Sequence, residues 1–355
     1  MSKTGMTHAN NGLKKALRLG VGLSALLMGT QFSAMAQTEE DEGARRLNTV
    51  IVSATKRERT LQDVPVAVSV VDDGVIEKAE IQDLNDLQTL VPSLQVGQLQ
   101  SSANTNFIIR GFGNGANNAG IEPSVGVFID GVYRSRSAAQ ISDLPNLQRV
   151  EVLRGPQSTL FGKNASAGVI SVITRAPQFE TEANLAATIG NYGSYRVRGD
   201  ITGPVSDKLA YSLSGNLNLR EGYASDLNTG SEVNERQRWG VRGQLLFVPN
   251  DELEIRFIGD YDNIDEVCCV AGNLVNGPTG EDIFDLGGQI DPENPFSYDV
   301  FNNFDSTNKI ENQGLSMQAD YDLGLATLTS ITSVSYTHLR AHETNNSISY
   351  AVFCL

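Results

Sequence analysis

Histidine and cysteine are scarce in this chain of 355 residues, which contains three of each and a single tryptophan. Residues 37–334 contain no histidine and no G-x-S-x-G motif. A hydrolase needs a nucleophile, a base and an acid that converge, and histidine is the usual base. We therefore predict that the protein is not an enzyme, and we expect neither a cofactor nor a bound metal.

Basic residues are also fewer than acidic ones. The chain has 27 Lys and Arg residues and 42 Asp and Glu residues, which gives a net charge of −15. Nucleic-acid binding needs clustered Lys and Arg to neutralise phosphates, so we expect no nucleic-acid partner. Long apolar runs are missing as well. A transmembrane helix needs about 20 apolar residues to cross the bilayer, so any membrane insertion has to use strands.

The first 36 residues have the layout of a secretory signal peptide. Basic residues without any acidic residue precede an apolar run at 19–29, and the small residues Ala34 and Ala36 follow. This order is typical of a signal peptide that is cleaved after Ala36, so we expect the protein to be exported. Residues 37–46 are polar and rich in acidic side chains, which predicts a disordered periplasmic tail.

Residues 47–177 combine short β-branched runs with one helical pattern. Apolar residues from Ile81 to Leu90 recur at helical spacing, and Pro92 would end that helix. Short apolar runs then alternate with Gly and Asn turns. The pattern predicts a compact α+β domain.

From Glu182 onward the pattern changes to strict alternation of apolar and polar residues. In one run, Trp239, Val241, Leu245 and Phe247 share one face of a predicted strand, and mostly polar residues share the other. These runs have about ten residues or more, whereas strands of soluble sandwiches have about 5–6. Short turns also alternate with long loops. We therefore favour a transmembrane β-barrel over a soluble sandwich.

Three stretches carry a resemblance to a known family, in this order: FIIRGFG (107–113), VGVFIDGVY (125–133) and RVEVLRGPQSTLFGKNASAGVISVITRAP (149–177). They resemble the plug domain of the TonB-dependent outer-membrane receptors. The resemblance implies an α+β plug domain at 56–177 inside a transmembrane antiparallel β-barrel, which has 22 strands when complete. Residues 178–334 would then form the first strands of that barrel.

The length available for the barrel is short for such a structure. Residues 178–334 suffice for about seven strands, and a barrel closes only with all of its strands because open edges cannot face lipid. We therefore interpret the chain as an N-terminal fragment with an incomplete barrel. Residues 335–355 no longer resemble the family, and we hypothesise that they are not native.

Residues 47–55, LNTVIVSAT, stand where the family carries its TonB box. The segment is short and β-branched, so its backbone edge is suited to adding a strand to the sheet of a partner. The resemblance implies binding to the periplasmic protein TonB and, through it, to an inner-membrane energising complex. The residues assigned to TonB binding are Thr49, Val50, Ile51, Val52, Ser53 and Ala54.

The resemblance also implies active uptake of a scarce nutrient through the outer membrane of a Gram-negative cell. The small-molecule ligand expected first is a metal chelate, a ferric siderophore, with cobalamin, haem or a glycan as alternatives. A passive porin is a more remote alternative, because a porin needs neither a TonB box nor plug motifs. Outer-membrane lipid would surround the barrel.

The plug motifs contain glycines and charged residues with separate expected roles. Each of four glycines follows a short strand, where a tight turn needs positive φ or a close backbone approach. The resemblance implies that two arginines latch the plug to acids of the barrel; the alternative is ordinary surface ion pairs, which contribute about 0–1 kcal/mol each. The motif residues are Arg110, Gly111, Asp130, Gly131, Arg154, Gly155 and Gly162, with Arg110 and Arg154 as the expected latch.

Two further pairs of residues lie in predicted loops. Arg134 and Arg136 suit an anionic ligand such as a ferric chelate, and solvated loop arginines are the alternative. Cys268 and Cys269 are adjacent in a long loop. Exported proteins are oxidised, so we expect a disulfide, formed either between these two or with cysteines elsewhere.

Overall fold

The computed structural model describes residues 50–341, apart from 58, 82, 99–101, 115–120, 141–142, 144–145, 269, 271–274, 291–293 and 295. The predicted signal peptide, the acidic tail and residues 47–49 of the predicted TonB box lie outside the described residues, as do residues 342–355. No helix of the described part is long and apolar enough to cross a membrane.

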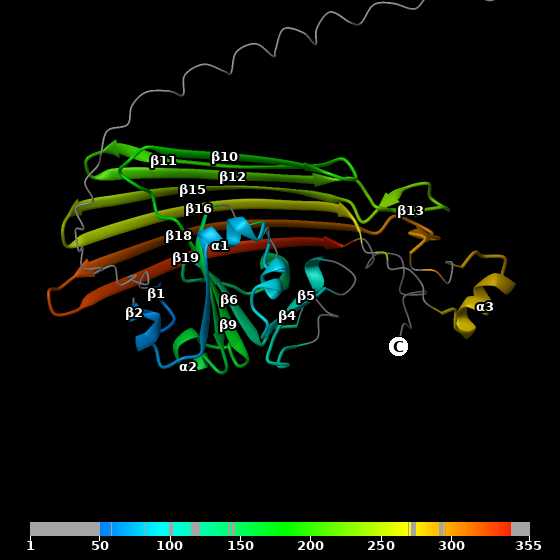
Figure 1. The fold of residues 1–355 in the computed structure, drawn as a ribbon, viewed down its shortest axis with the longest axis horizontal. Helices are drawn as coiled ribbons and strands as arrows, with labels where there is room; N and C mark the ends of the chain where they lie inside the picture. The colour runs from blue at the N-terminus through cyan, green and yellow to red at the C-terminus, as the bar shows by residue number, and fades with distance from the viewer. Residues whose placement is uncertain are drawn as a thin grey trace, which may run out of the picture. The chain divides into compact units, whose positions relative to one another are not determined.

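A seven-stranded antiparallel sheet makes up the second half of the described chain (Figure 1). Its strands have 9 to 16 residues, and about 9–11 residues suffice for a tilted strand to cross a bilayer. We call it the barrel sheet. In spatial order its strands are β10 (Glu182–Gly190), β11 (Ser194–Ser206), β12 (Leu209–Arg220), β15 (Arg236–Asn250), β16 (Leu253–Val267), β18 (Thr307–Asp322) and β19 (Thr327–Ala341).

Burial alternates along β15 in the way the sequence predicts. Arg238 and Arg242 are buried against the plug domain, whereas Trp239 and Val241 are 42% and 47% exposed on the opposite face. The other central strands repeat this alternation, with exposed Leu, Phe and Tyr side chains on the outer face. An apolar face of this extent is suited to lipid. The alternation therefore confirms the predicted antiparallel strands of a transmembrane barrel wall.

Strand β19 does not end at the boundary predicted after Val334. It continues to Ala341 and pairs in regular register with β18 as far as Asn308. The exposed outer face also continues, because Val334 and Tyr336 are 66% and 57% exposed. Residues 335–341 of the hypothesised non-native tail are thus part of a strand, and the origin of that tail stays a hypothesis.

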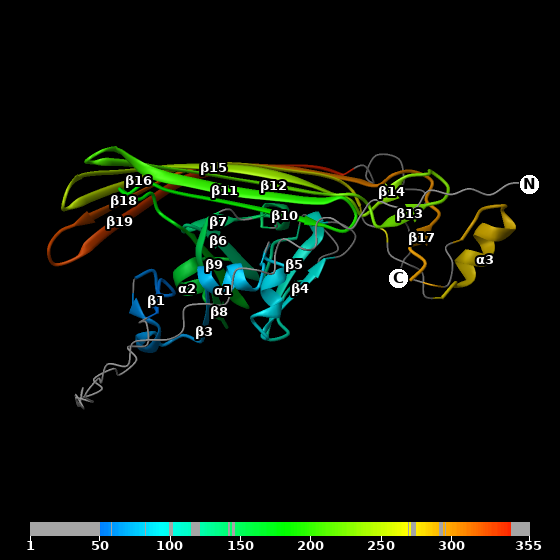
Figure 2. The ribbon, with the colours of Figure 1, turned by 45° about the horizontal axis from the view of Figure 1, so that its top comes forward.

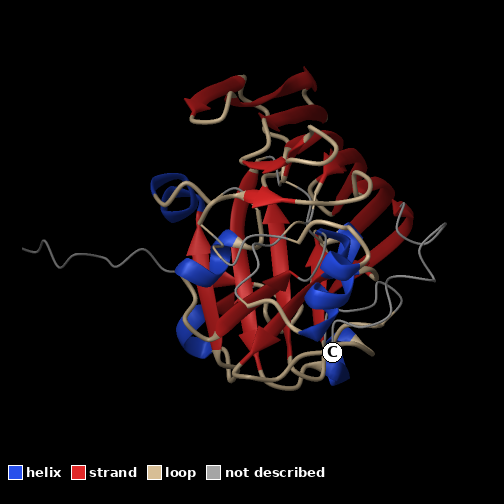
Figure 3. Ribbon diagram, turned by 90° about the vertical axis from the view of Figure 1, so that its right-hand side faces the viewer, coloured by secondary structure: helices blue, strands red, loops and turns tan. Residues whose placement is uncertain are grey.

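The plug domain is α+β and is built on a five-stranded mixed sheet of order β3-β8-β9-β6-β7, in which β6 and β9 are parallel. Two smaller sheets, β1-β2 and β4-β5, accompany it. Figure 2 shows these sheets beside the barrel sheet, and Figure 3 shows how short the helices are. The elements are β1 (Ile51–Val52), β2 (Arg59–Thr60), β3 (Val68–Asp72), β4 (Leu94–Gln98), β5 (Thr105–Ile109), β6 (Val125–Ile129), β7 (Val132–Arg134), β8 (Leu147–Arg154), β9 (Gly168–Thr174), α1 (Asp73–Lys78), α2 (Ser158–Phe161) and the 3₁₀ helices η1 (Leu61–Asp63), η2 (Asp86–Thr89), η3 (Ser102–Asn104) and η4 (Ser137–Ala139).

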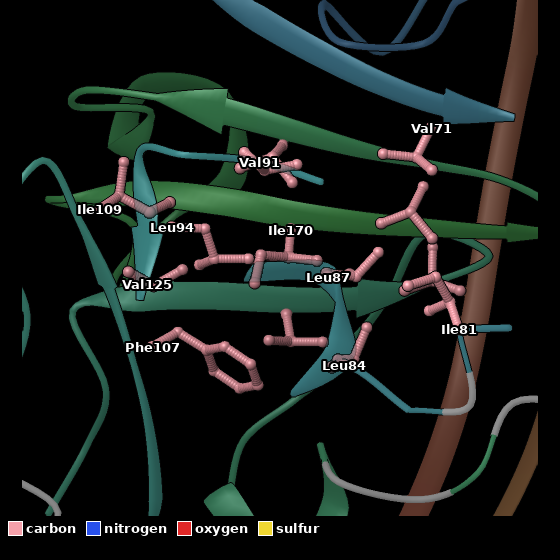
Figure 4. Packing of buried hydrophobic residues seen from close by; sticks show 14 of the residues in the cluster. Val71, Ile81, Leu84, Leu87, Val91, Leu94, Phe107, Ile109, Val125 and Ile170 are labelled. Carbon is pink, nitrogen blue, oxygen red and sulfur yellow. The ribbon is translucent and has the colours of Figure 1, made fainter. Parts of the chain in front are cut away.

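One face of the plug sheet carries the main apolar core. Val125 and Ile170 project from the strands, and Leu84, Leu87 and Phe107 pack over them (Figure 4). Fully burying one such side chain contributes about 1.5–3 kcal/mol. Every buried member of this cluster belongs to the plug domain, so the plug has an apolar core of its own.

The continuous helix predicted between Ile81 and Pro92 is wrong. Among its described residues the stretch forms only the short helix η2. The Asp83 side chain accepts a hydrogen bond from the backbone N–H of Asn85 at 2.8 Å, and such local bonds compete with helical hydrogen bonding. The apolar residues at helical spacing are buried all the same, in turns rather than in a helix.

Two long loops of the barrel sheet are joined by a small three-stranded sheet. Its central strand pairs antiparallel within its own loop and parallel with a strand of the next loop. The second loop also contains an exposed helix. The elements are β13 (Ala224–Asp226), β14 (Glu232–Val233), β17 (Asp299–Val300) and α3 (Pro278–Asp285).

A buried carboxylate holds these two loops together. Asp226 accepts hydrogen bonds from the backbone N–H groups of Asn228 at 3.0 Å and Thr229 at 3.2 Å in its own loop. It also accepts one from Asn302 of the second loop at 3.2 Å. Burial acts to raise the pKa of Asp226, but these hydrogen bonds favour the charged form and together lower that pKa.

All four glycines of the plug motifs adopt positive φ, between 76° and 93°, as predicted. Asp130 and Gly131 form the two-residue turn between β6 and β7, where Ile129 faces Val132. Such turns need positive φ at both central residues, and Asp130 accordingly has a φ of 45°. A Cβ on Gly131 would also lie 2.7 Å from Cδ1 of Ile331 in β19. Gly131 is therefore needed both for the turn and for close approach of the barrel sheet.

We predict that Gly131→Ala destabilises the protein more than Gly155→Ala. Both changes place a Cβ at positive φ, which costs about 1–2 kcal/mol, but a Cβ at Gly155 meets nothing within 4 Å. The terminal methyl group of Ile331 also has to shift in Gly131→Ala, which adds up to about 1 kcal/mol. Ile331→Val removes the clashing methyl group and should restore that increment only. Urea titrations in detergent measure the free energy of unfolding, and equal losses at the two glycines would contradict the close approach.

Candidate functional site

The turn of the β6-β7 hairpin carries a buried carboxylate that contacts both domains. Asp130 accepts hydrogen bonds from the backbone N–H and the hydroxyl of Thr174 in β9 at 2.9 and 2.8 Å. Arg242 of β15 donates a hydrogen bond to the same carboxylate. One plug side chain is thus fixed within its own domain and paired with a cation of the barrel sheet.

The network extends through Asp260 of β16. Arg242 donates to Asp260 at 3.2 Å, and Arg134 of β7 donates to its two oxygens at 2.9 and 3.0 Å. The four side chains are 2–15% exposed, and the hairpin and the barrel sheet each contribute one acid and one arginine. We call Asp130, Arg134, Arg242 and Asp260 the hairpin latch.

A second group of charges surrounds Arg238 of β15. Its guanidinium lies 2.6 Å from Glu266 of β16, 3.4 Å from Asp83 and 3.7 Å from Asp143. Both aspartates belong to the plug, and Asn218 of β12 donates to Asp143 at 2.8 Å. Burial raises the pKa of Asp143, although Arg238 and Asn218 favour its charged form. We call Arg238, Asp83, Asp143 and Glu266 the Arg238 cluster.

In both groups a buried charge depends on a partner from the other domain. Desolvation costs several kcal/mol per ion, and the cost is offset only while the partner and its hydrogen bonds are in place. Removing one partner of a buried pair costs about 3–5 kcal/mol. The interface is therefore tightly held while docked and loses much of its stabilisation when one partner is displaced.

The two arginines predicted to latch the plug form no ion pair with the described residues. Arg110 lies in a two-residue turn with a φ of 54°, and its side chain is exposed. Arg154 is partly buried, and its Nε has no hydrogen-bond partner in the described part. The observed ion pairs mostly run the other way: the arginine, Arg238 or Arg242, belongs to the barrel sheet and the acid belongs to the plug.

Sequence reasoning placed Asp130 in a plug motif but missed its partners. The available signal is the alternation along β15, which puts Arg236, Arg238 and Arg242 in one row on the inner face. A row of cations facing a closed interior requires acids opposite to it. The sequence pattern does not show which acids pair with these arginines.

The structure places Arg134 differently from the outward loop expected for it. This residue lies in β7 rather than in an outward loop, and its guanidinium is 7% exposed and paired with Asp260. An anionic ligand would have to displace that carboxylate. Arg136 is exposed, and a ligand contact there stays a prediction.

Cys268 is disulfide-bonded, in agreement with the oxidised state expected of an exported protein. Cys269 lies outside the described residues. The pairing of the two therefore stays open. Among the described residues no group of three or more His, Cys, Asp or Glu side chains is arranged to hold a metal ion.

The described part of the predicted TonB box is folded rather than free. Ile51 and Val52 form β1 and pair with β2. Val52 and Ala54 are 0% and 1% exposed and pack into a second apolar cluster of the plug. One backbone edge of this segment is thus paired within the plug domain. Thr49 lies outside the described residues.

Comparison with known proteins agrees with this architecture. Residues 60–169 match the family model of the TonB-dependent Receptor Plug Domain. The chain thus contains a plug domain of the TonB-dependent receptors, joined to antiparallel strands of a barrel wall. This family match, with the barrel strands and the outer-membrane relative described next, places the protein in the outer membrane of a Gram-negative cell.

Two curated relatives are similar in sequence. The pesticin receptor of Yersinia pestis is 28% identical over 179 residues, which cover 50% of this chain and 26% of the relative. The iron-regulated outer membrane virulence protein of Vibrio cholerae is 30% identical over 220 residues, which cover 57% of this chain and 32% of the relative. The chain thus spans between a quarter and a third of the length of these relatives.

Two solved structures share the fold. The ferric yersiniabactin uptake receptor of Yersinia pestis superposes with a TM-score of 0.66 at 20% identity, over 78% of this chain and 41% of that one. The ferripyoverdine receptor of the Pseudomonas aeruginosa outer membrane gives a TM-score of 0.65 at 16% identity, over 82% of this chain and 37% of that one. At these identities the likeness shows a shared fold.

We predict that Arg242→Met loosens the plug from the barrel sheet. The substitution leaves the carboxylates of Asp130 and Asp260 without their shared cation, so the free energy of unfolding should fall by about 3 kcal/mol. Arg198→Met on β11 is the matched control, because Arg198 is exposed and forms no ion pair with described residues. Limited proteolysis of the plug and urea titration report the change. Equal effects at both arginines would contradict the latch.

We also predict opposite pH responses at two buried aspartates. The raised pKa of Asp143 means that the folded protein keeps a proton that the unfolded chain releases near pH 3.8, so this contribution to stability falls as the pH rises through the raised pKa. Asp143→Asn should remove this pH-dependent loss, while Arg238 keeps Glu266 and Asp83 as partners.

Asp226 has a lowered pKa, so its contribution to stability is present above pH 3.8 and is lost as the pH falls through the lowered value. Asp226→Asn should therefore destabilise the protein at neutral pH. Thermal midpoints measured from about pH 2 to pH 8 cover both pH windows and separate the two signs. A pH slope that both variants change in the same direction would refute the assignment.

Proposed function

We propose that the protein is a TonB-dependent receptor that imports a small ligand across the outer membrane. The observation that carries this proposal is the pairing of Asp130 with Arg242, which docks a separate domain on the polar face of transmembrane strands. A domain held there by buried ion pairs obstructs the path along that face. Passage of a ligand then requires the plug to rearrange.

A ferric siderophore is the substrate that the similarities favour. The solved structures that share the fold include an uptake receptor for ferric yersiniabactin and a receptor bound to ferripyoverdine, and the Vibrio cholerae relative is described as iron-regulated. Cobalamin, haem and glycans are the alternative cargoes of the same machinery. We infer that the protein transports this ligand without chemical conversion, because residues 37–334 offer no histidine base.

The segment at 49–54 is proposed as the point where TonB pulls. It leads directly into β2, η1 and β3 of the plug, so a force on it reaches the plug sheet through a short length of chain. The hairpin latch resists that force until one ion pair opens. Opening one ion pair leaves the neighbouring buried charges without a partner. Complete release of the plug is therefore favoured over partial loosening.

We predict that deleting residues 49–54 abolishes energised uptake but leaves ligand binding at the cell surface intact. Deletion of the six tail residues 38–43 is the control of equal length. Uptake of iron-55 as a ferric siderophore by iron-limited cells, with and without the gene, measures transport, and binding at 0 °C measures the surface site. Undiminished uptake by the 49–54 deletion would refute the mechanism. Iron uptake that does not depend on the gene would instead favour cobalamin, haem or a glycan as the substrate.

A further inference from the structure

Three arginines on the inner face of the barrel sheet have no acidic partner among the described residues. Arg196 lies near the start of β11, Arg220 ends β12 and Arg236 begins β15. None of them forms an ion pair with a described residue, whereas Arg238 and Arg242 of the same face both pair with carboxylates. We call Arg196, Arg220 and Arg236 the rim arginines.

The strand register places the three side chains next to one another. Arg220 and Arg236 are directly opposite partners on β12 and β15, and Arg196 is opposite Asn218, two positions before Arg220. Directly opposite side chains have Cβ atoms about 4.5–5.5 Å apart, and diagonal neighbours are about 7–8 Å apart. Like charges directly opposite one another are destabilising. The sheet by itself therefore gains no stability from this arrangement.

The surroundings hold the rim arginines in place without neutralising them. Arg220 donates a hydrogen bond to the carbonyl of Asn234 at 2.7 Å, and its Cζ lies 5.2 Å from the centre of the Tyr223 ring. The Nε atoms of Arg196 and Arg220 are buried and have no hydrogen-bond partner in the described part of the chain. A buried N–H group without an acceptor costs free energy. The rim arginines thus offer both positive charge and hydrogen-bond donors to an acceptor that binds beside them.

The acids close to the rim arginines are already engaged. Glu235 accepts a hydrogen bond from the N–H of Val267 at 3.0 Å. On the plug, Asp143 lies 3.7 Å from Arg238 and accepts a hydrogen bond from Asn218 at 2.8 Å. These carboxylates therefore do not pair with the rim arginines.

The rim arginines lie at the end of the barrel sheet from which the long loops leave. Arg220 and Arg236 flank the loop at 221–235, and β1 lies toward the opposite end of the sheet (Figures 1 and 2). In the proposed function β1 belongs to the segment on which TonB acts. The rim arginines are thus on the side from which a ligand would arrive.

We propose that the rim arginines bind the ligand and select one that carries several negative charges on oxygen atoms, such as the ferric complex of three catecholates. Guanidinium groups match oxyanions through planar, charge-assisted hydrogen bonds, and such an anion relieves the repulsion between the three cations. An uncharged glycan or the neutral ferric complex of three hydroxamates provides no such compensation. This inference rests on the proposed function and narrows its substrate class.

The test compares Arg220→Gln with Lys309→Gln in the receptor as it is expressed in the outer membrane. Both changes remove one positive charge near the long loops, but Lys309 is exposed on the outer face and pairs with Asp265. Binding of an iron-55 tris-catecholate complex to cells at 0 °C should weaken about tenfold in Arg220→Gln and about a hundredfold when Arg236→Gln is added. Lys309→Gln should leave this binding unchanged. An iron-55 tris-hydroxamate complex should bind the unaltered receptor at least about tenfold more weakly.

Stability measurements separate binding from a structural role. If the rim arginines paired with acids elsewhere in the protein, Arg220→Gln would lower the free energy of unfolding in urea. A binding role leaves that free energy unchanged or raises it, because repulsion between like charges is lost. Arg236→Gln alone gives the same reading if Arg220→Gln does not fold.

Three results would overturn the proposal: equal binding of the two iron complexes, binding of neither, or equal effects of Arg220→Gln and Lys309→Gln. A lower free energy of unfolding in Arg220→Gln, with unchanged binding, would do the same. Binding at 0 °C needs no energised uptake. Failure of the proposed function is therefore seen separately, as uptake that the 49–54 deletion does not change.

Discussion

The ion pair between Asp130 and Arg242 joins the plug to the barrel sheet at a place where neither charge can stay buried alone. Neighbouring residues position the two charges for this contact. Gly131 allows the tight turn that presents Asp130, and its missing side chain admits Ile331 of the barrel sheet. Thr174 fixes the carboxylate from within the plug. The docking of the two domains follows from satisfying this one desolvated charge.

The two faces of the barrel sheet lie in different environments, and the alternation of side chains along its strands reflects both. The outer face is apolar and suited to lipid, and the inner face carries arginines that a closed interior would leave uncompensated. The plug supplies the missing acids at Asp130, Asp83 and Asp143. The plug is thus part of the electrostatic balance of the sheet, because its removal would leave Arg238 and Arg242 short of partners.

The same chemistry recurs at both ends of the proposed mechanism. Asp130 and Glu151 are buried plug carboxylates; Asp130 accepts a hydrogen bond from Arg242 of the barrel sheet, and Glu151 accepts hydrogen bonds from Ser53 beside β1. Such bonds are strong when dry and are replaced by water once the elements part. They can therefore hold a resting state firmly and still release it once one partner is displaced. A purely apolar contact would lack this directional, all-or-none character.

The sequence by itself determined features that depend on neighbouring residues: the strand periodicity with its lipid face, the positive φ of the four plug glycines and the α+β class of the plug. It failed where tertiary context competes, as at Asp83, whose side chain helps to replace the predicted helix by turns. It also assigned Arg110 and Arg154 to the latch and Arg134 to a ligand. Only the tertiary structure decided the actual pairs, because strand register and hairpin placement bring together residues such as Asp130 and Arg242, which are 112 positions apart.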